Sequence, residues 1–254
     1  MSRTLLFGEG LFETLRWKAS EEKLLLHYQR LSNSARWLGI PCPSYEDFSR
    51  EIQKATSGAD GLYVKYLLLS RGGDYLADAP SGYSTLVVVK PLRAQPERVR
   101  LAVSSYRRHS SDPVCRHKST SYLFNLLVKK EALRLGFWDA LVQNEKGHLC
   151  ETATSNLLLL KGSKFYTPAR DSGLLWGTTL EFLSRRVEVR EDYVKLSDLE
   201  KCDGLFVINS LLLCAAVEEV QGTSLRLDLQ ALKALLHTLK ACLYSPPEEG
   251  LQGR

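Results

Sequence analysis

The sequence predicts a globular protein of the mixed α/β class, with its helices and strands in an α+β arrangement. The chain has 254 residues, of which 44% are hydrophobic and 25% charged, so it is long enough and apolar enough to bury a substantial core. Apolar residues recur at helical spacing near both ends of the chain, and short strand-like runs lie between them. Together these observations predict the class.

The N-terminal half is expected to begin with helices and to continue with strands. Apolar residues at helical spacing predict a helix over residues 24–38 that ends at Gly39, with Arg30 beside its apolar stripe. A second helix is expected over residues 45–56. Strands are expected at residues 62–70, 84–89 and 99–106. Turns are expected at Gly72-Gly73 and at residues 80–82.

The C-terminal half is expected to mix strands with shorter helices. A helix over about residues 121–135 precedes a hairpin of strands 139–143 and 148–152, joined by the turn Asn144-Glu145-Lys146-Gly147. The further expected elements are strands at 156–160, 164–166, 205–208 and 212–220, and helices at 176–186 and 229–243. The tail over residues 245–254 is expected to be frayed.

Composition and charge exclude several functional classes. The apolar runs are much shorter than the roughly 20 residues that cross a bilayer, and the N-terminus lacks a signal-peptide pattern, so a soluble, cytoplasmic protein that does not bind membranes is expected. Six scattered cysteines predict reduced thiols and no metal site. The net charge of +5 is mild, which favours small anionic ligands over nucleic acid.

Three blocks of residues carry a family resemblance: Gly8-Glu9-Gly10-Leu11-Phe12-Glu13-Thr14, His117-Lys118-Ser119-Thr120-Ser121-Tyr122-Leu123 and Glu151-Thr152-Ala153-Thr154-Ser155-Asn156. The chain resembles the class IV aminotransferases, the fold-type IV pyridoxal-phosphate enzymes, over about residues 7–222. That family includes branched-chain and D-amino-acid aminotransferases and 4-amino-4-deoxychorismate lyase.

The resemblance implies a D-amino-acid-aminotransferase-like fold with pyridoxal 5′-phosphate as cofactor. It implies a small N-terminal α/β domain over residues 1–108, a larger C-terminal cofactor-binding domain over residues 109–254, and the cofactor in the cleft between them. It also implies a homodimer whose active sites lie close to the subunit interface. The hairpin that usually precedes the first block in the family is expected to be missing or trimmed.

Lys118 is the expected catalytic residue, the lysine that binds the cofactor as a Schiff base. An amine that attacks an aldehyde must be partly neutral, and burial beside other cations lowers the pKa of a lysine. Arg116 and His117 would supply those cations if they point inward. Spacing alone favours a solvated surface lysine, and the matching block reverses that preference.

Glu151 resembles the family's glutamate that pairs with the pyridine nitrogen of the cofactor and keeps it protonated, so that the ring withdraws electrons. The alternative is an exposed position on a hairpin strand, where most glutamates are found. Asn156 ends the same block and is placed with the cofactor-binding residues. A neutral residue in place of Glu151 is expected to lose most of the rate.

Phosphate binding is expected at Gly177-Thr178-Thr179, where backbone N–H groups at a helix start and the Thr179 hydroxyl converge. By resemblance, Arg30 and Ser210 complete this anion cup, the arginine as a bidentate donor. The alternatives are a surface salt bridge for Arg30 and simple helix capping for Thr178 and Thr179.

One tyrosine and one basic cluster each have two possible interpretations. Tyr122 is expected one helical turn beyond Lys118, where it would hydrogen-bond the ring oxygen of the cofactor or, alternatively, pack in the helix core. Arg107, Arg108 and His109 precede the lysine block and would either meet a substrate carboxylate or lie in a solvated linker.

Within the family, the run Phe206-Val207-Ile208-Asn209-Ser210-Leu211 is similar to the corresponding block of 4-amino-4-deoxychorismate lyases. That enzyme removes pyruvate from its small-molecule substrate and yields 4-aminobenzoate, a step of folate biosynthesis. The alternative is an aminotransferase acting on D-amino acids or branched-chain amino acids, and a third possibility is a non-catalytic relative. The chain departs from the family pattern at Leu180, commonly arginine, and at Ala216, often proline, which leaves the geometry of the anion cup open.

Overall fold

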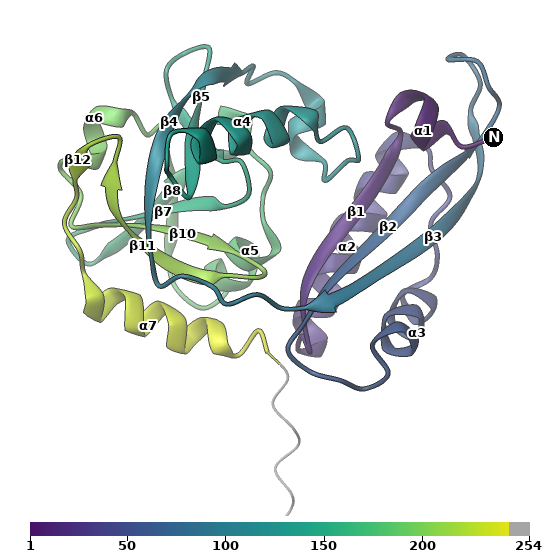
Figure 1. Cartoon of the computed structure of the whole chain (residues 1–254), viewed down its shortest axis with the longest axis horizontal. Helices are drawn as coiled ribbons and strands as arrows, with labels where there is room; N and C mark the ends of the chain where they lie inside the picture. The colour runs from purple at the N-terminus through teal and green to yellow at the C-terminus, as the bar shows by residue number, and fades with distance from the viewer. Residues whose placement is uncertain (244–254) are drawn as a thin grey trace, which may run out of the picture.

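The computed structural model describes residues 1–243, and the strands of this part form two sheets (Figure 1). The smaller sheet has the antiparallel order β1-β2-β3, and Leu24, Leu31, Phe48 and Ile52 of α2 and α3 pack in one core with its strands. The N-terminal elements are α1 (Arg3–Phe7), β1 (Gly10–Trp17), α2 (Glu21–Leu38), α3 (Tyr45–Thr56), β2 (Leu62–Gly72) and β3 (Pro80–Pro91).

The two faces of the small sheet have different neighbours. Leu11 and Leu15 of β1 are buried in the core with α2, whereas Phe12 and Thr14, which alternate with them, line a cleft on the opposite face. Thr14 pairs with Lys65 of β2, so Lys65 lies on the cleft face as well. The alternation of one strand therefore separates structural from cleft-facing positions.

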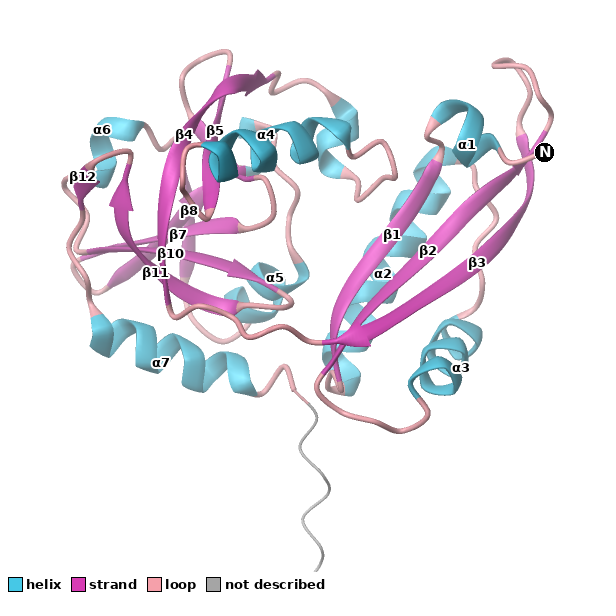
Figure 2. Ribbon diagram, in the orientation of Figure 1, coloured by secondary structure: helices cyan, strands magenta, loops and turns pink. Residues whose placement is uncertain are grey.

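The larger sheet is mixed and has the order β6-β5-β4-β11-β10-β7-β8-β9, with β12 paired to β11. Figure 2 shows strands of this sheet, among them β4, β10 and β11, in magenta. β4 runs parallel to both β11 and β5. Its strands and the helices among them are β4 (Arg98–Arg108), η1 (Pro113–Arg116), α4 (Leu123–Arg134), β5 (Asp139–Asn144), β6 (Leu149–Thr152), β7 (Asn156–Lys161), β8 (Lys164–Pro168), η2 (Arg170–Ser172), α5 (Thr178–Ser184), β9 (Val189–Asp192), α6 (Leu196–Leu199), β10 (Gly204–Asn209), β11 (Leu213–Val220), β12 (Thr223–Ser224) and α7 (Leu229–Lys240).

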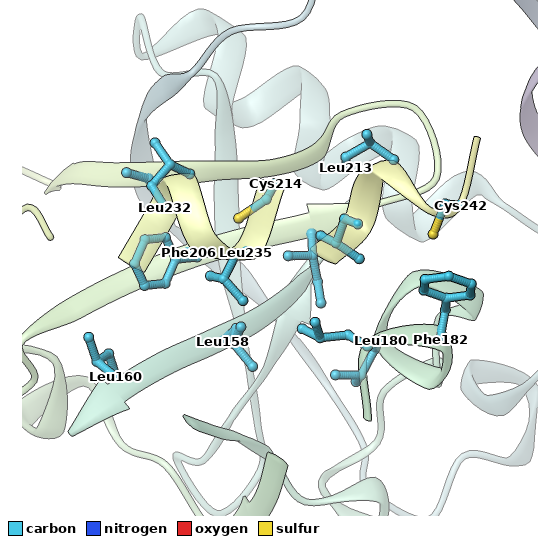
Figure 3. Close-up of a cluster of buried hydrophobic side chains, with 14 of the residues drawn as sticks. Leu158, Leu160, Leu180, Phe182, Phe206, Leu213, Cys214, Leu232, Leu235 and Cys242 are labelled. Atoms are coloured by element: carbon cyan, nitrogen blue, oxygen red, sulfur yellow. The ribbon is translucent and has the colours of Figure 1, made fainter. Parts of the chain in front are cut away.

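Strands β7 and β10 are buried on both faces, which explains their nearly continuous apolar sequences. Leu158 and Phe206 pack with Leu232 and Leu235 of α7 and with Leu180 of α5, as Figure 3 shows. The residues next to Leu158 and Phe206 in sequence point to the other face of the sheet, where they pack in a second buried hydrophobic cluster. Leu180, where the family commonly has arginine, is thus a buried core residue that anchors α5.

Most expected elements are present, with ends that differ by a few residues, and the mixed α/β class is confirmed. One turn was wrong. Residues 80–82 belong to β3, because Pro80 and Gly82 pair with Gly72 and Arg71 across a register shift. Proline is tolerated at a strand end because its missing N–H is not needed there. The tail over residues 245–254 lies outside the described residues, and among residues 1–243 no helix is long and apolar enough to cross a membrane.

The strand before the expected domain boundary belongs to the larger sheet. The boundary after residue 108 falls at the end of β4, which is hydrogen-bonded to strands of the C-terminal part on both sides. The chain passes from one sheet to the other in the connection over residues 92–97. We therefore propose that the two parts join at this connection.

Candidate active site

A cleft of about 480 Å³ lies between the two sheets and is lined by side chains from both. Phe12, Thr14 and Lys65 come from the small sheet, whereas Glu151 and Asn156 come from the large one. All of the site residues expected from the sequence line this cleft: Arg30, Lys118, Tyr122, Glu151, Asn156, Thr178, Thr179 and Ser210.

The lysine block is held by direct pairing with the first motif block. The Phe12 N–H donates to the Lys118 carbonyl at 2.9 Å, and the Thr120 N–H donates to the Gly10 carbonyl at 2.8 Å. Gly10 must be small, because a Cβ there would come within 2.8 Å of Thr4 and 2.9 Å of Thr120. The first motif block and the lysine block are therefore joined by backbone hydrogen bonds into one structural unit.

Lys118 is half-buried in the cleft, and burial together with the Arg30 charge lowers its pKa to about 8. Its Nζ lies 4.6 Å from the ring centroid of Phe12 and 5.5 Å from that of Tyr122. In the described part of the chain the Nζ makes no hydrogen bond. The amine is thus partly neutral near pH 8 and free to react.

Glu151 is buried, with 6% of its surface exposed, so the alternative of an exposed hairpin position is wrong. Its Oε1 accepts a hydrogen bond from Nη1 of Arg108, which is itself buried. Burial raises the pKa of Glu151, and the Arg108 charge opposes that shift. The Arg108 guanidinium also donates to the Gly173 carbonyl at 3.1 Å. Arg108 is therefore a buried partner of Glu151 and not part of a solvated linker.

Asn156 positions the backbone before α5. Its Nδ2 donates to the Leu175 carbonyl at 2.8 Å, and its Oδ1 accepts from the Gly177 N–H at 3.1 Å. A Cβ on Gly177 would come within 2.2 Å of that oxygen, so a larger residue at this position would displace the Asn156 amide. In this structure the polar atoms of Asn156 hold the protein chain, although the side chain also lines the cleft.

Tyr122 does not lie on a helix with Lys118. It is the N-cap residue of α4, and the chain before it is not helical, so the expected spacing of one helical turn was wrong. Its hydroxyl donates to the Ala153 carbonyl at 3.1 Å, and its ring meets Phe12 edge-on with 5.1 Å between centroids. Burial raises the pKa of Tyr122, so the hydroxyl stays protonated.

The residues expected to form an anion cup come together where α5 begins beside the β10–β11 turn. Thr178 Oγ1 lies 3.1 Å and Thr179 Oγ1 3.4 Å from Ser210 Oγ, and Ser210 Oγ lies 3.2 Å from Nε2 of His27. No side chain caps the start of α5, so simple capping by the threonines does not describe this arrangement. The cup joins three hydroxyls from two distant segments.

Arg30 faces into the molecule beside this cup. Its Nε and Nη2 donate to the two carboxylate oxygens of Glu13 at 2.8 and 2.6 Å, and Nδ1 of His27 lies 2.6 Å from the same carboxylate. Burial would raise the pKa of Glu13, but Arg30 and His27 outweigh it and lower the pKa to about 2. Burial lowers the pKa of His27 to about 4. Arg30 is thus in a salt bridge, as one alternative held, but an inward-facing one.

Sequence reasoning missed Glu13, Lys23 and His27. Lys23, His27 and Arg30 are spaced four and three residues apart, which places them on one face of α2. Three basic residues on one helix face, next to an apolar stripe, are a signal that could have been found. Glu13 gave a weaker signal, because its position among the buried residues of β1 becomes visible only with the strand assignment.

The cleft thus brings a partly neutral amine and a buried acid together with a cluster of three hydroxyl groups. The family model of amino-transferase class IV matches residues 10–220. The chain belongs to the class IV aminotransferase family.

Curated relatives with two different names are about equally similar to this chain. A Rickettsia typhi protein named a probable branched-chain-amino-acid aminotransferase is 29% identical over 94% of this chain and 85% of its own length. The aminodeoxychorismate lyase of Vibrio harveyi is 27% identical over 89% of this chain and 88% of its own length. The family is therefore established, whereas the specific reaction is not resolved by similarity.

Solved structures agree with the expected fold type. A structure from Legionella pneumophila, whose name proposes a 4-amino-4-deoxychorismate lyase, has a TM-score of 0.85 with 27% identity and covers 93% of this chain and 92% of its own. A T.th. branched-chain amino acid aminotransferase, solved with pyridoxamine 5′-phosphate, has a TM-score of 0.85 with 23% identity and covers 97% and 89%. The fold class and, at the level of the family, the pyridoxal-phosphate cofactor are confirmed.

Proposed function

We propose that the cleft binds pyridoxal 5′-phosphate with its phosphate in the cup of Thr178, Thr179 and Ser210. The residues fit such a group: hydroxyl donors and Arg30 suit a phosphate, and the buried acid Glu151 suits a protonated ring nitrogen. Lys118, with its pKa lowered to about 8, suits the attachment of an aldehyde.

We infer further that the reaction is the elimination of pyruvate from 4-amino-4-deoxychorismate. The observation that carries this proposal is the basic lining of the cleft beyond the cofactor residues, which includes Lys65 and Arg107. The substrate carries two carboxylates, which such a lining matches, whereas the side chain of leucine requires an apolar pocket. Asn209, of the block that resembles the lyases, donates from Nδ2 to Ser155 Oγ at 2.9 Å and so joins the Ser210 turn to the Glu151 block.

When bound, the cofactor supplies an electron sink for the charge that remains when a proton leaves the amine-bearing carbon. Lys118 takes that proton, since its amine lies in the cleft and is partly neutral. The same residue then returns a proton to the departing enolpyruvate, which leaves as pyruvate. The ring product, 4-aminobenzoate, is aromatic, so the elimination is hard to reverse and needs no second keto acid.

The assay supplies purified protein and cofactor with 4-amino-4-deoxychorismate in the absence of any keto acid. The proposal expects 4-aminobenzoate and pyruvate in equal amounts. A second assay offers leucine or D-alanine with 2-oxoglutarate, because similarity to the Rickettsia typhi protein supports an aminotransferase as the second candidate. Glutamate formation in the second assay, without 4-aminobenzoate in the first, would overturn the lyase proposal.

We also propose that the protein is a homodimer. Helix α4 follows Tyr122 of the cleft and leaves Leu123, Leu126 and Leu127 exposed at 65%, 46% and 39%. A second copy would cover such a face and lie close to the cleft. Light scattering at micromolar concentration should give twice the chain mass, and a monomer would contradict the proposal. The expected cytoplasmic location stays a prediction.

A further inference from the structure

Lys23 is a buried lysine behind the anion cup that the catalytic proposal does not use. It lies in the first turn of α2 and is 3% exposed. Its Nζ donates to Thr178 Oγ1 at 2.9 Å and to Thr179 Oγ1 at 2.8 Å. It contacts the hydroxyls from the side away from the cleft, since it does not line the cleft itself.

The carboxylates nearest to Lys23 are already engaged by other cations. Glu13 accepts from Arg30 and lies against His27, and Glu22 accepts from Arg186. Within residues 1–243, Lys23 has hydrogen bonds to hydroxyls and forms no salt bridge. A buried ammonium group without a carboxylate is costly, and an anion arriving in the cup would compensate it.

Charge balance makes Lys23 the source of the positive charge of the cup. The charge of Arg30 is offset by Glu13, to which it is bound by two hydrogen bonds. Lysine has three donors and no acceptor, so a protonated Lys23 can only donate to the threonine hydroxyls. The hydrogens of those hydroxyls are thereby turned away from Lys23, toward Ser210, His27 and the cleft.

We propose that Lys23 is a positioning residue that gives the cup its net positive charge and orients Thr178 and Thr179 as donors, so that the site selects the phosphorylated cofactor. The proposal rests on the proposed function in one respect, that the cup receives the phosphate. Burial lowers the pKa of Lys23 to about 7, which a bound anion would reverse. The titratable and charged groups around it are Cys242, Arg30, Glu13, Glu22 and His27.

The test compares the dissociation constants of pyridoxal 5′-phosphate and of pyridoxal for cofactor-free full-length protein, measured by absorbance. In the Lys23→Met variant, the preference for the phosphorylated form should fall roughly tenfold, as expected for one charge-assisted interaction. Lys54→Met removes an exposed lysine of α3 and should leave the preference unchanged. A preference in Lys23→Met within twofold of wild type would overturn the proposal.

A second readout separates this role from a merely structural one. Millimolar inorganic phosphate should raise the unfolding temperature of the cofactor-free wild type and not that of Lys23→Met. A structural role instead predicts a lower unfolding temperature without phosphate and an unchanged response. Should Lys23→Met not unfold cooperatively, Lys23→Gln is measured in the same way, and a wild-type preference there also overturns the proposal. If wild type itself does not distinguish the two cofactor forms, the proposed phosphate site and the role of Lys23 both fail.

Discussion

The molecule has two lysines whose pKa is lowered by burial, Lys118 in the cleft and Lys23 behind the anion cup, and their surroundings differ. Lys23 donates to two hydroxyls at 2.9 and 2.8 Å, within a network that continues to Ser210. Lys118 lies over the rings of Phe12 and Tyr122, with no hydrogen bond in the described structure. Burial alone therefore does not make a lysine a nucleophile. The hydrogens of the Lys23 amine are directed to two hydroxyl groups outside the cleft lining, whereas the Lys118 amine lines the cleft and has no such partner.

The largest expected effect comes from removing the reactive lysine and from locating the covalently bound cofactor. Lys118→Ala should lower the turnover rate at saturating cofactor roughly a thousandfold, because one residue serves as attachment point, base and acid. Borohydride reduction followed by peptide mass spectrometry should place the pyridoxyl group on Lys118 in wild type and in Lys23→Met. A pyridoxyl group on Lys23, or an unchanged rate in Lys118→Ala, would remove the distinction.

Substitution of Glu151, the buried acid of the cleft, should have a smaller effect, which two separate measurements can detect. Glu151→Gln should lower the turnover rate roughly a hundredfold, because a neutral amide no longer keeps a ring nitrogen protonated. It should also lower the free energy of unfolding by roughly 3 kcal/mol, since it leaves the buried Arg108 without a charged partner. Steady-state kinetics and urea unfolding measure the two. A stability loss with an unchanged rate would make the pair structural only.

The smallest effect concerns the pH dependence of stability in the cofactor-free protein. The pKa of Lys23 is lowered from 10.5 to about 7, so between pH 7 and 8 the unfolded chain binds a proton that the folded chain loses. The free energy of unfolding should therefore rise with pH, with a contribution from Lys23 of at most about 1.4 kcal/mol per pH unit. Lys118, with its pKa lowered to about 8, adds less in this window.

Urea unfolding at pH 7 and pH 8, below the ordinary pKa of a cysteine thiol, measures this slope. Lys23→Met should have a shallower slope than wild type, because the Lys23 contribution is removed while the contributions of the other groups remain. It should also be at least as stable as wild type at pH 7, since a buried charge has been removed. Equal slopes in the two proteins would show that Lys23 is not the titrating group.

Prediction from sequence succeeded where the relevant information is local. The helical spacing of α2, the hairpin around residues 145–148 and the lysine block were found because periodicity, turn residues and motif lie within a short stretch of chain. The expected site residues all line one cleft, although their individual roles stay predictions.

Prediction failed where a residue acquires its meaning from a distant partner. Arg108 was left between a solvated linker and a substrate contact, because its partner Glu151 is 43 positions away. Residues 80–82 were expected to turn, since proline and glycine mark turns locally, yet pairing with β2 extends the strand through them. The boundary was expected after residue 108, because the pairing of β4 with two strands of the C-terminal part is not visible in the sequence.

The sequence by itself determined the class of the fold, most of its helices and strands, and the lysine and acid blocks of the cleft. These features depend on side-chain spacing and on residues that are neighbours in the chain. Only the tertiary structure decided which cations are paired with a carboxylate. Arg30 is bound to Glu13, whereas Lys23 donates only to hydroxyl groups that lie 155 and 156 positions away in the chain. The physical reason is that charge balance is set by distances across packed elements, and those distances follow from sheet register and helix packing rather than from order along the chain.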